Sequence, residues 1–353
     1  MLKMPLFVYR IIRYEYWPSW VFYLPIMSYW MYLSIRMRSL TFFTLANPGI
    51  ELGGFFGESK SAILSKIHPD FLPKQCMVET QNVDEVLQQL VSVGIAFPFI
   101  AKPDIGERGT SVTKVTSVQE LTEYMQLVKG ARFMIQEFLD YSEEFGVFYS
   151  RLPNEKTGKI TSLTGKVFLA VTGDGKQTIA ELMEQSVRAR FQLPRFLLEQ
   201  PERMKQIIPA GEKVVLEPIG NHCRGTEFVN ANQHITAELT ALFDEIAVPI
   251  DGFFYGRFDI KVRSIEDLRV GKTIKIMELN GVSSEPGHIY DTRMSLIRAY
   301  YDVTRHWKEL AKIAQQNRKD GVEKIRFSAI VRLYVRHVLM GKPLTPQNKT
   351  EGN

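Results

Sequence analysis

Two short runs of alternating apolar and polar positions lie near the C-terminal end of the chain, over residues 253–262 and 273–287. The first reads FFYGRFDIKV, the second begins TIKIMELNG, and the charged segment RSIEDLRVGK lies between them. Runs of this length with a polar, glycine-containing connection predict two antiparallel strands joined by a long turn. Because strand side chains alternate between faces, Arg257 and Asp259 share one face of the first strand. Glu278 and Asn280 share a face of the second in the same way.

These four polar residues indicate a metal and phosphate site if the two faces coincide. Carboxylate and carboxamide oxygens suit Mg²⁺, which keeps several waters and takes the rest of its shell from substrate phosphates. Arg257 beside them would stabilise charge that develops on a transferred phosphoryl or acyl-phosphate group. The alternative is a solvated hairpin whose outward residues have no chemical role. The glycine-rich stretch at 106–110 and the Gly and Ser residues after Asn280 count against that alternative.

Periodicity along the rest of the chain predicts a mixed α+β protein. Strands are expected over 72–79, 97–102 and 112–115 and twice within 131–151, and a strand-like piece begins at residue 41. Helices are expected over 58–66, 82–94 and 117–129, after the GDGK turn at 173–176, and within 186–206, 292–319 and 324–340. The polar tail that follows is expected to be disordered.

A second candidate site lies in residues 97–115, FPFIAKPDIGERGTSVTKV. Lys102 stands at the end of the first predicted strand, and a flexible glycine loop with hydroxyl side chains follows it. The motif is hairpin-like and contains no GxxxxGK[ST] sequence, so it is not a Walker loop. Such a loop can close over a triphosphate with its backbone N–H groups, while Lys102 contacts phosphate as a point charge. An ordinary hairpin turn is the alternative.

The N-terminal segment, residues 1–40, is aromatic and basic. Its residues 16–35 are twenty positions without a charge, eight of them Tyr, Trp or Phe, and Pro18 and Pro25 interrupt any helix there. Aromatic residues with basic flanks favour an interfacial or re-entrant membrane anchor. A true membrane span and a segment buried against the protein or a partner remain open as alternatives.

Charge and cysteine content exclude some classes of function. The segment 1–40 carries five basic residues and one acidic residue, so 5 − 1 = +4 of the net charge of +5 lies there. The remainder is close to neutral, which argues against a nucleic-acid surface. Cys76 and Cys223 are far apart in sequence, which gives neither a metal-binding spacing nor a disulfide framework.

The order FPFIAKP, glycine loop, MIQEFLD…EEF, GRFDIKV and MELNG resembles the ATP-grasp superfamily over roughly residues 58–300. It is most similar to the branch of carboxylate–amine ligases like D-alanine–D-alanine ligase. The resemblance implies two α+β lobes that clasp ATP with Mg²⁺ or Mn²⁺, preceded by a small α/β lobe. The expected divisions are 1–40, 41–95, 96–140 for the small ATP-grasp lobe, 141–320 for the large one, and 321–353.

The resemblance also implies roles for individual residues, of which Arg257 would steady the acyl-phosphate and the tetrahedral intermediate. The expected phosphate and adenosine contacts are Lys60, Lys102, Gly106, Gly109, Thr110, Ser111, Glu137, Phe138, Leu139, Glu144 and Met277. The expected metal ligands are Asp259, Glu278 and Asn280. Lys166 is expected to reach the γ-phosphate, and the loop of Asn221, His222, Arg224 and Gly225 to cover the acyl-phosphate, with Asn221 and Arg224 as its catalytic candidates.

The reaction implied is attack of a substrate carboxylate on ATP, followed by displacement of phosphate by an amine or thiol. Backbone N–H groups near Gly281 are expected to help hold the oxyanion. A phosphotransferase acting on a hydroxyl, and a membrane-attached nucleotide-binding protein without turnover, are the alternatives. The expected partners are small or lipid-linked carboxylate and amine substrates and an anionic membrane surface, with no nucleic acid and a homodimer left open. The expected location is cytoplasmic, at the inner face of the cell membrane.

Overall fold

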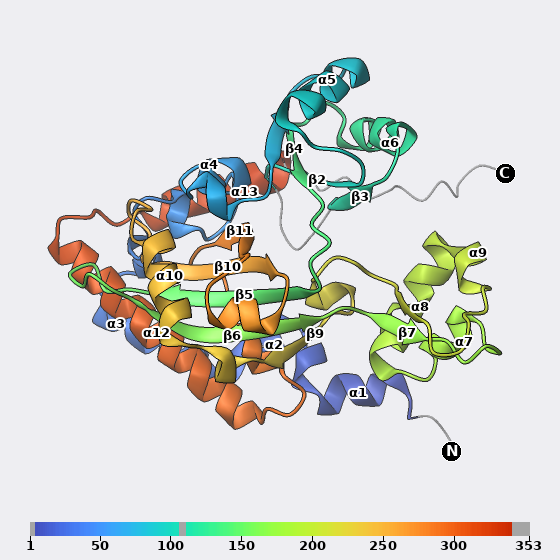
Figure 1. Ribbon diagram of the computed structural model, residues 1–353. Coiled ribbons are helices and arrows are strands. Elements are labelled where there is room, and N and C mark those ends of the chain that lie inside the picture. The colour runs from blue at the N-terminus through green and yellow to red at the C-terminus, as the bar shows by residue number, and fades with distance from the viewer. Residues whose placement is uncertain (1–3, 106–110, 341–353) are drawn as a thin grey trace.

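The computed structural model describes residues 4–105 and 111–340, and in α13 the side chains of residues 334 and 336–340 are not described. Within this range the chain forms two main antiparallel sheets and one small one (Figure 1). The four-stranded sheet has the order β1 (Gln75–Val78), β4 (Phe133–Glu137), β2 (Phe99–Pro103), β3 (Thr113–Val115). The five-stranded sheet has the order β11 (Lys275–Asn280), β10 (Tyr255–Val262), β5 (Glu143–Ser150), β6 (Lys159–Val167), β9 (Glu227–Asn230).

Two helices cover one face of the four-stranded sheet, α5 (Val83–Val93) and α6 (Val118–Val128). The Asn82 side chain caps α5 by accepting a hydrogen bond of 2.9 Å from the Asp84 N–H, and Gly94 ends it with a left-handed φ of 67°. Their apolar faces join the strands in one core with residues such as Val86, Leu121 and Phe133. The expected division at residue 95 falls within this unit, because β1 pairs with β4.

The two faces of the five-stranded sheet pack against different elements. Val147 and Phe258 belong to the core that includes Phe243 of α10 (Ala237–Ala247). Phe148 and Tyr255 belong instead to a core with residues of the N-terminal segment and of α12 (Leu296–Lys319). The alternation of strand side chains produces this division. Arg257 and Asp259 share a face of β10 with Tyr255. They therefore lie on the side of the sheet that faces the N-terminal segment.

Residues 168–217 form a small subdomain beside the larger sheet (Figure 1). It pairs β7 (Ala170–Thr172) with β8 (Lys213–Val215) and carries α7 (Ile179–Met183), α8 (Val187–Glu199) and α9 (Pro201–Met204). The expected capped helix after the GDGK turn is confirmed, because Thr178 and Glu181 form a capping box at the start of α7. The subdomain has its own core, which includes Ile179, Met183 and Phe196.

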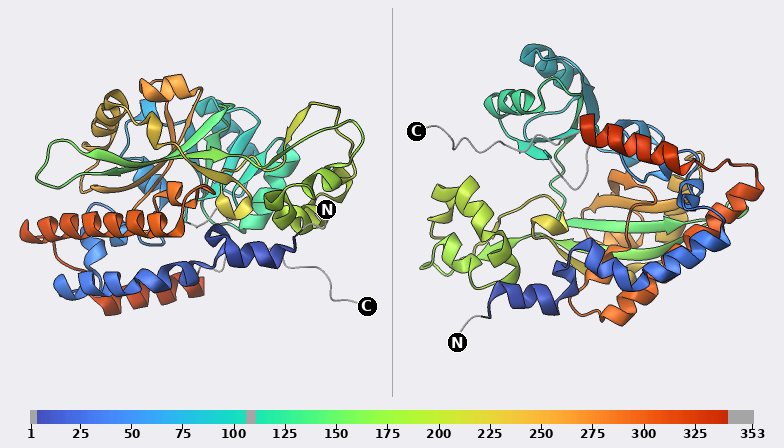
Figure 2. Two further views of the ribbon diagram at one scale, coloured as in Figure 1. Left: turned by 90° about the horizontal axis from the view of Figure 1, so that it is seen from below. Right: turned by 180° about the vertical axis from the view of Figure 1, so that it is seen from behind.

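The N-terminal segment folds as α1 (Leu6–Ile12), α2 (Ser19–Tyr23) and α3 (Met27–Arg36), with short 3₁₀ turns Tyr14–Tyr16 and Leu24–Ile26 between them. It runs along α12, and Figure 2 shows α3, α12 and α13 (Phe327–Met340) together on one side of the molecule. Phe22 and Leu33 are buried there, at 1% and 3% exposure. No helix in the described part of the chain combines the length and apolar character needed to cross a bilayer.

The remaining short elements connect these units. They are α4 (Lys60–Leu64), α11 (Ile265–Arg269) and the 3₁₀ turns Phe42–Leu45, Glu51–Gly53, Pro69–Phe71, His222–Arg224, Asn232–His234 and Gly287–Tyr290. The strand-like piece expected from residue 41 is wrong, since residues 42–45 form a 3₁₀ turn. Phe42, Phe43 and Leu45 are all buried, so they do not alternate, and Asn317 of α12 donates a hydrogen bond of 2.8 Å to the Leu45 carbonyl.

Candidate functional site

The hairpin of β10 and β11 brings four polar residues together as the sequence predicted. In its antiparallel register Arg257 lies opposite Asn280, and Asp259 lies opposite Glu278. Directly opposed residues of an antiparallel pair project from the same side of the sheet. The two faces therefore coincide, and the expected arrangement of an Arg, an Asp, a Glu and an Asn is confirmed. The connection between the strands contains α11 and is longer than a simple turn.

Asp259 is the centre of this group. Both of its oxygens accept from Arg257, at 2.9 Å from Nε and 3.1 Å from Nη2, and Asn280 Nδ2 donates to Oδ2 at 3.3 Å. Lys166 Nζ lies 3.4 Å from Oδ1. Burial acts to raise the pKa of the Asp259 carboxyl, but the charges of Arg257 and Lys166 outweigh it, so the pKa is lowered. Asp259 is therefore an anion at neutral pH although it is 6% exposed.

The donor set fits a hard divalent cation that is shared with a phosphorylated ligand. Asp259 and Glu278 face each other across the hairpin, where two like charges would repel without a nearby cation. Among residues 4–105 and 111–340, no group of three or more His, Cys, Asp and Glu residues could hold a metal by itself. Two carboxylates and the Asn280 carboxamide would supply part of an Mg²⁺ or Mn²⁺ shell, and waters and phosphate oxygens the rest.

Lys102 joins the four-stranded sheet to this hairpin. Its ammonium group donates to the Met277 carbonyl of β11 at 2.9 Å and to Gln136 Oε1 of β4 at 3.1 Å. Burial, together with the charge of Lys60, lowers the pKa of Lys102 to about 8, although the charges of Glu278 and Asp259 oppose this shift. Lys60, at the start of α4, lines the same cavity. The two lysines expected at the phosphates thus lie together.

Lys166 and Glu144 form a buried ion pair on neighbouring strands. Lys166 Nζ lies 2.8 Å from Glu144 Oε1, and both side chains are nearly inaccessible. Burial acts to lower the pKa of Lys166, but Asp259 and Glu144 outweigh it and raise the pKa. Gly220 packs directly on this pair, because a Cβ atom there would lie 2.2 Å from Glu144 Oε1. The structure therefore places Glu144, expected at the ribose, beside the lysine expected at the γ-phosphate.

The connector between β4 and β5 carries the residues expected around adenine. The Leu139 carbonyl accepts a hydrogen bond of 3.2 Å from Lys261, and Lys114 Nζ lies 3.8 Å from the centre of the Phe138 ring. Phe138, Leu139 and Met277 line the main cavity, whereas Glu137 lines a shallower adjoining one of about 530 Å³. The Glu137 N–H donates to the Lys74 carbonyl at 2.8 Å.

Part of the expected glycine loop falls outside the part of the chain that the structure describes. Gly106, Gly109 and Thr110 lie outside the described residues. Ser111 has a left-handed φ of 56°, and its carbonyl accepts a hydrogen bond of 3.0 Å from Tyr124. The next residue, Val112, lines the main cavity.

The main cavity has a volume of about 820 Å³ and lies between the two sheets. The four-stranded sheet contributes Lys102 and Gln136, and the five-stranded sheet contributes Lys166, Arg257, Asp259 and Glu278. A further wall comes from the N-terminal segment through Tyr14, Glu15, Trp17, Ser19 and Phe22. No sequence motif indicated that these five residues belong to a site. Their only signal is the aromatic density of the segment, which favours a membrane anchor and leaves burial against the protein open.

Glu15 attaches the N-terminal segment to the loop at 218–225. Its carboxylate pairs with Arg188 of α8 and lies 3.7 Å from His222 Nε2. Asn221 and His222 line the cavity. Arg224 instead pairs with Glu217, with Nε 3.4 Å from Oε2, and it is not among the residues that line the cavity. Of the two candidates on this loop, Asn221 thus borders the cavity and Arg224 does not.

The backbone after Gly281 is occupied by contacts with another loop. The Val282 N–H donates to the Gly53 carbonyl at 3.1 Å, and the Ser283 N–H donates to the Gly54 carbonyl at 3.2 Å. Gly54 has a φ of 80°, and a Cβ atom there would lie 2.6 Å from the Gly281 Cα, so glycine is required for this approach. The expectation that these N–H groups hold an oxyanion is therefore wrong for Val282 and Ser283.

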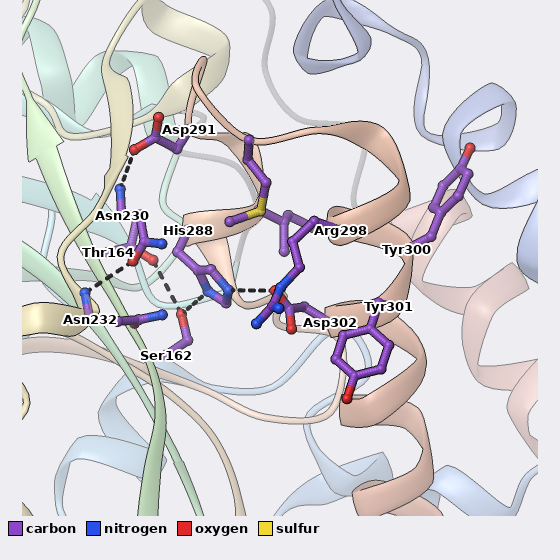
Figure 3. Close-up of polar contacts among 12 residues, drawn as sticks. Ser162, Thr164, Asn230, Asn232, His288, Asp291, Arg298, Tyr300, Tyr301 and Asp302 are labelled. Carbon is purple, nitrogen blue, oxygen red and sulfur yellow. Dashed lines mark hydrogen bonds and ion pairs between the residues drawn. The ribbon is translucent and has the colours of Figure 1, made fainter.

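A Ser–His–Asp chain is present outside the cavity (Figure 3). Ser162 Oγ lies 2.6 Å from His288 Nδ1, and His288 Nε2 lies 3.3 Å from Asp302 Oδ2. Arg298 Nε also lies 3.0 Å from that Asp302 oxygen. Ser162 is fully buried, and none of the three residues lines the main cavity. We interpret the chain as a structural link between β6, the 287–290 turn and α12.

No family model matches the chain. No curated protein matches it either. Three solved structures to which it is similar are a bifunctional glutathione synthetase from Pasteurella multocida, the VanG D-Ala:D-Ser ligase from Enterococcus faecalis and the D-alanine–D-alanine ligase from Coxiella burnetii. Their identities are 14%, 13% and 11%, their TM-scores are 0.37, 0.39 and 0.40, and they cover 71%, 69% and 80% of this chain.

The matched region spans 36%, 57% and 61% of the lengths of these three proteins. Another similar structure is described as the ATP-grasp ligase PsnB, with 14% identity and a TM-score of 0.34 over 64% of this chain and 52% of that protein. These proteins are of the kind that the sequence motifs resemble. Since all of these TM-scores are below 0.5, the α+β fold with two lobes rests on the strand order and register given above.

Proposed function

We propose that the protein is an ATP- and Mg²⁺-dependent ligase that activates a substrate carboxylate as an acyl-phosphate and releases ADP. The observation that supports this proposal is the convergence of Lys102, Lys166 and Arg257 on the Asp259–Glu278 pair. These groups come from two sheets and line one cavity of about 820 Å³. Phosphoryl transfer depends chiefly on positioning and on charge stabilisation, and a buried cluster of fixed cations supplies both.

The residues have distinct parts in this proposal. Lys102 and Lys166 hold phosphate oxygens, and Asp259, Glu278 and Asn280 hold the metal ion, which when bound neutralises phosphate charge. Phe138, Leu139 and Met277 enclose the adenine, with Glu137 and Glu144 nearby. Arg257 holds the acyl-phosphate while an amine forms a bond to its carbonyl carbon. The C–O bond to phosphate then breaks, phosphate leaves with the electron pair, and the proton lost by the amine nitrogen passes to the released phosphate.

Hydroxylamine trapping tests this proposal. The full-length protein would be incubated with ATP, Mg²⁺, hydroxylamine and pools of candidate carboxylic acids, and the products would be examined for a hydroxamate and for ADP. A hydroxamate that forms only with ATP supports an acyl-phosphate. ADP formation with a phosphorylated alcohol and no hydroxamate would instead identify a phosphotransferase. Absence of any nucleotide turnover with a broad substrate pool would contradict both activities.

We further propose that the protein docks on an anionic membrane through an outer N-terminal face. We define this face as Trp20, Leu24, Met27, Met31 and Ile35 of the N-terminal segment together with Phe327, Val331 and Val335 of α13. Each set recurs at steps of three or four residues, which is helical spacing, and all eight side chains are exposed. The opposite stripe of the N-terminal segment, which includes Phe22 and Leu33, is buried in the protein.

The charge around this outer N-terminal face favours acidic lipid headgroups as the occupant. The exposed basic residues of the same segments are Arg10, Arg13, Arg36, Arg38, Lys324, Arg326 and Arg332, with Glu323 as an exposed acid among them. Glu15, the single acid of residues 1–40, points inward and pairs with Arg188. Exposed apolar side chains among basic residues match the interface of an anionic bilayer. Lipid-linked substrates would be accessible to a protein held there.

A further inference from the structure

The carboxylate of Glu285 is held by two tyrosines at the edge of the cavity. Tyr23 Oη of α2 donates to Oε1, and Tyr290 Oη donates to Oε2 at 2.7 Å. Arg257 Nη1 lies 3.4 Å from the Glu285 main-chain carbonyl. Arg257 also pairs with Asp259, with 2.9 Å between Nε and Oδ1. Glu285 therefore lies next to the candidate reaction centre. Glu285 and Tyr290 both line the cavity.

Aromatic rings surround this carboxylate. The Phe22 ring lies 5.1 Å from the Tyr23 ring, 5.9 Å from the Tyr290 ring and 5.8 Å from the Tyr14 ring, measured between centroids. Tyr14 and Phe22 line the cavity, as does Trp17. The faces of such rings carry partial negative charge and attract cations. This end of the cavity therefore combines an apolar aromatic wall with the carboxylate of Glu285.

The two tyrosine contacts of Glu285 carry no charge, and the cation that interacts with its carboxylate is Arg257, which also pairs with Asp259. Burial, reinforced by the charge of Glu285, raises the pKa values of Tyr23 and Tyr290 well above the ordinary range, so both hydroxyls are neutral donors. Glu15, the other carboxylate on this wall, pairs with the cation Arg188. Each oxygen of Glu285 accepts one tyrosine hydrogen bond, and a carboxylate oxygen can accept two. Both oxygens can thus accept a further donor from a ligand.

The segment that carries Glu285 and Tyr290 is held in place by contacts with β6, α12 and the N-terminal segment. His288 bonds Ser162 of β6 and Asp302 of α12, and Asp291 Oδ2 accepts from the Asn230 N–H at 2.7 Å (Figure 3). On the N-terminal side, Tyr14 Oη donates to the Ile289 carbonyl at 2.6 Å. These contacts hold the carboxylate in place before a ligand arrives, which lowers the entropy lost on binding.

We propose that Glu285, with the rings of Tyr14 and Trp17, forms a binding subsite for a substrate that carries an ammonium group on an aromatic or otherwise apolar body. The ammonium group would bond Glu285, and the apolar body would pack on the rings. The subsite rests on the proposed ligase function in that it would hold the acceptor amine beside Arg257. It names the second substrate as an apolar primary or secondary amine.

The test uses 2-phenylethylamine as the probe and 2-phenylethanol as its neutral counterpart. Each would be titrated into the full-length protein by calorimetry, with and without Mg²⁺ and a non-hydrolysable ATP analogue. We expect the amine to bind at least tenfold more tightly than the alcohol. Glu285→Gln should remove this preference, whereas Glu199→Gln, on α8 away from the cavity, should keep it.

Equal binding of the amine and the alcohol by the wild-type protein would overturn the subsite, as would an unchanged preference in a folded Glu285→Gln variant. The wild-type comparison needs no variant, so it decides the question even if that variant does not fold. Binding of the ATP analogue is measured in the same samples. If the wild-type protein does not bind the ATP analogue, the proposed function is contradicted. If it binds the analogue but shows no preference for the amine, only this subsite is contradicted.

Discussion

Lys102 of β2 donates a hydrogen bond of 2.9 Å to the main-chain carbonyl of Met277 in β11, so a single buried ammonium group joins the two sheets of the protein. Met277 is the residue before Glu278, and it lines the cavity with Lys102. The contact holds a positive charge close to the candidate metal ligands. The protonation state of Lys102 should therefore affect the affinity of the cavity for anions.

We predict that ATP affinity depends on the protonation of Lys102. Because burial lowers its pKa to about 8, the lysine is charged below that pH and loses its charge above it. ATP affinity should therefore fall as the pH rises through about 8, by up to roughly tenfold per pH unit if only the charged form binds phosphate. Calorimetric titration with ATP between neutral and alkaline pH measures the profile.

Two substitutions separate Lys102 from other titrating groups. Lys102→Ala should weaken ATP binding by about 2 kcal/mol, or roughly thirtyfold, because a charge-assisted hydrogen bond is lost. Lys102→Arg keeps its charge at all accessible pH values, so its affinity should not fall above pH 8. A flat profile in the wild-type protein, or unchanged affinity in the alanine variant, would remove Lys102 from the phosphate site.

The carboxylates of the hairpin should control turnover. Asp259→Asn or Glu278→Gln should lower Mg²⁺-dependent ADP formation by about 10²-fold or more, because charge stabilisation by a metal ion is worth several kcal/mol. Glu266→Gln, an exposed change on α11 of the same hairpin, serves as the matched control and should leave the rate unchanged. Nucleotide products are separated by chromatography, and AMP with pyrophosphate from the wild-type protein would contradict the acyl-phosphate route.

Asn47 should be important for stability. Its amide donates to the carbonyls of Gly53 and Tyr255, and its Oδ1 accepts from the N–H groups of Phe254 and Tyr255. Asn47→Ala would leave these buried groups without partners, at a cost of about 1–3 kcal/mol for each group left unsatisfied. We expect a clear fall in the urea midpoint of unfolding. A midpoint equal to that of the wild-type protein would mean that water replaces all of these bonds.

The sequence predicted the hairpin correctly because the information is local. Alternation alone places Arg257 and Asp259 on one face of their strand and Glu278 and Asn280 on one face of theirs, and pairing of the two strands then brings these faces together. Lys102 could be expected near phosphates for a similar reason, since a lysine at a strand end next to a glycine loop is a local motif. Its bond to Met277 crosses 175 residues and could not be predicted from the sequence.

The wall formed by the N-terminal segment was missed because its contacts are non-local. Tyr23 reaches Glu285 across 262 residues, and Tyr14 reaches Ile289 across 275 residues. An aromatic stretch has the same composition whether it faces lipid or packs on protein. The structure shows one stripe buried and one exposed, and this division follows the helical period over residues 20–37. The roles of all the candidate site residues stay predictions.

The outer N-terminal face should bind anionic vesicles. Removal of residues 1–38 is a poor test, because it would strip the buried Phe22 and Leu33 and a wall of the cavity. Three exposed side chains can be changed instead. Trp20, Leu24 and Ile35 are 72%, 66% and 73% exposed, so Trp20→Ser, Leu24→Ser and Ile35→Ser should leave the fold intact. In a vesicle sedimentation assay the triple variant should stay in the supernatant, because each large apolar side chain fully buried in lipid contributes about 1.5–3 kcal/mol.

Matched controls decide whether this effect belongs to the outer N-terminal face or to surface hydrophobicity in general. Val91 of α5 and Leu198 of α8 are 80% and 77% exposed on other parts of the molecule, so Val91→Ser and Leu198→Ser should bind vesicles like the wild-type protein.

Arg36→Glu with Arg38→Glu should weaken binding to phosphatidylcholine vesicles that contain phosphatidylglycerol, by about 1 kcal/mol for each basic charge removed. It should change little with phosphatidylcholine alone. High salt should partly release the wild-type protein, because headgroup attraction is screened. Equal sedimentation of the triple variant and the wild-type protein would mean that this face contacts a protein or solvent rather than a membrane.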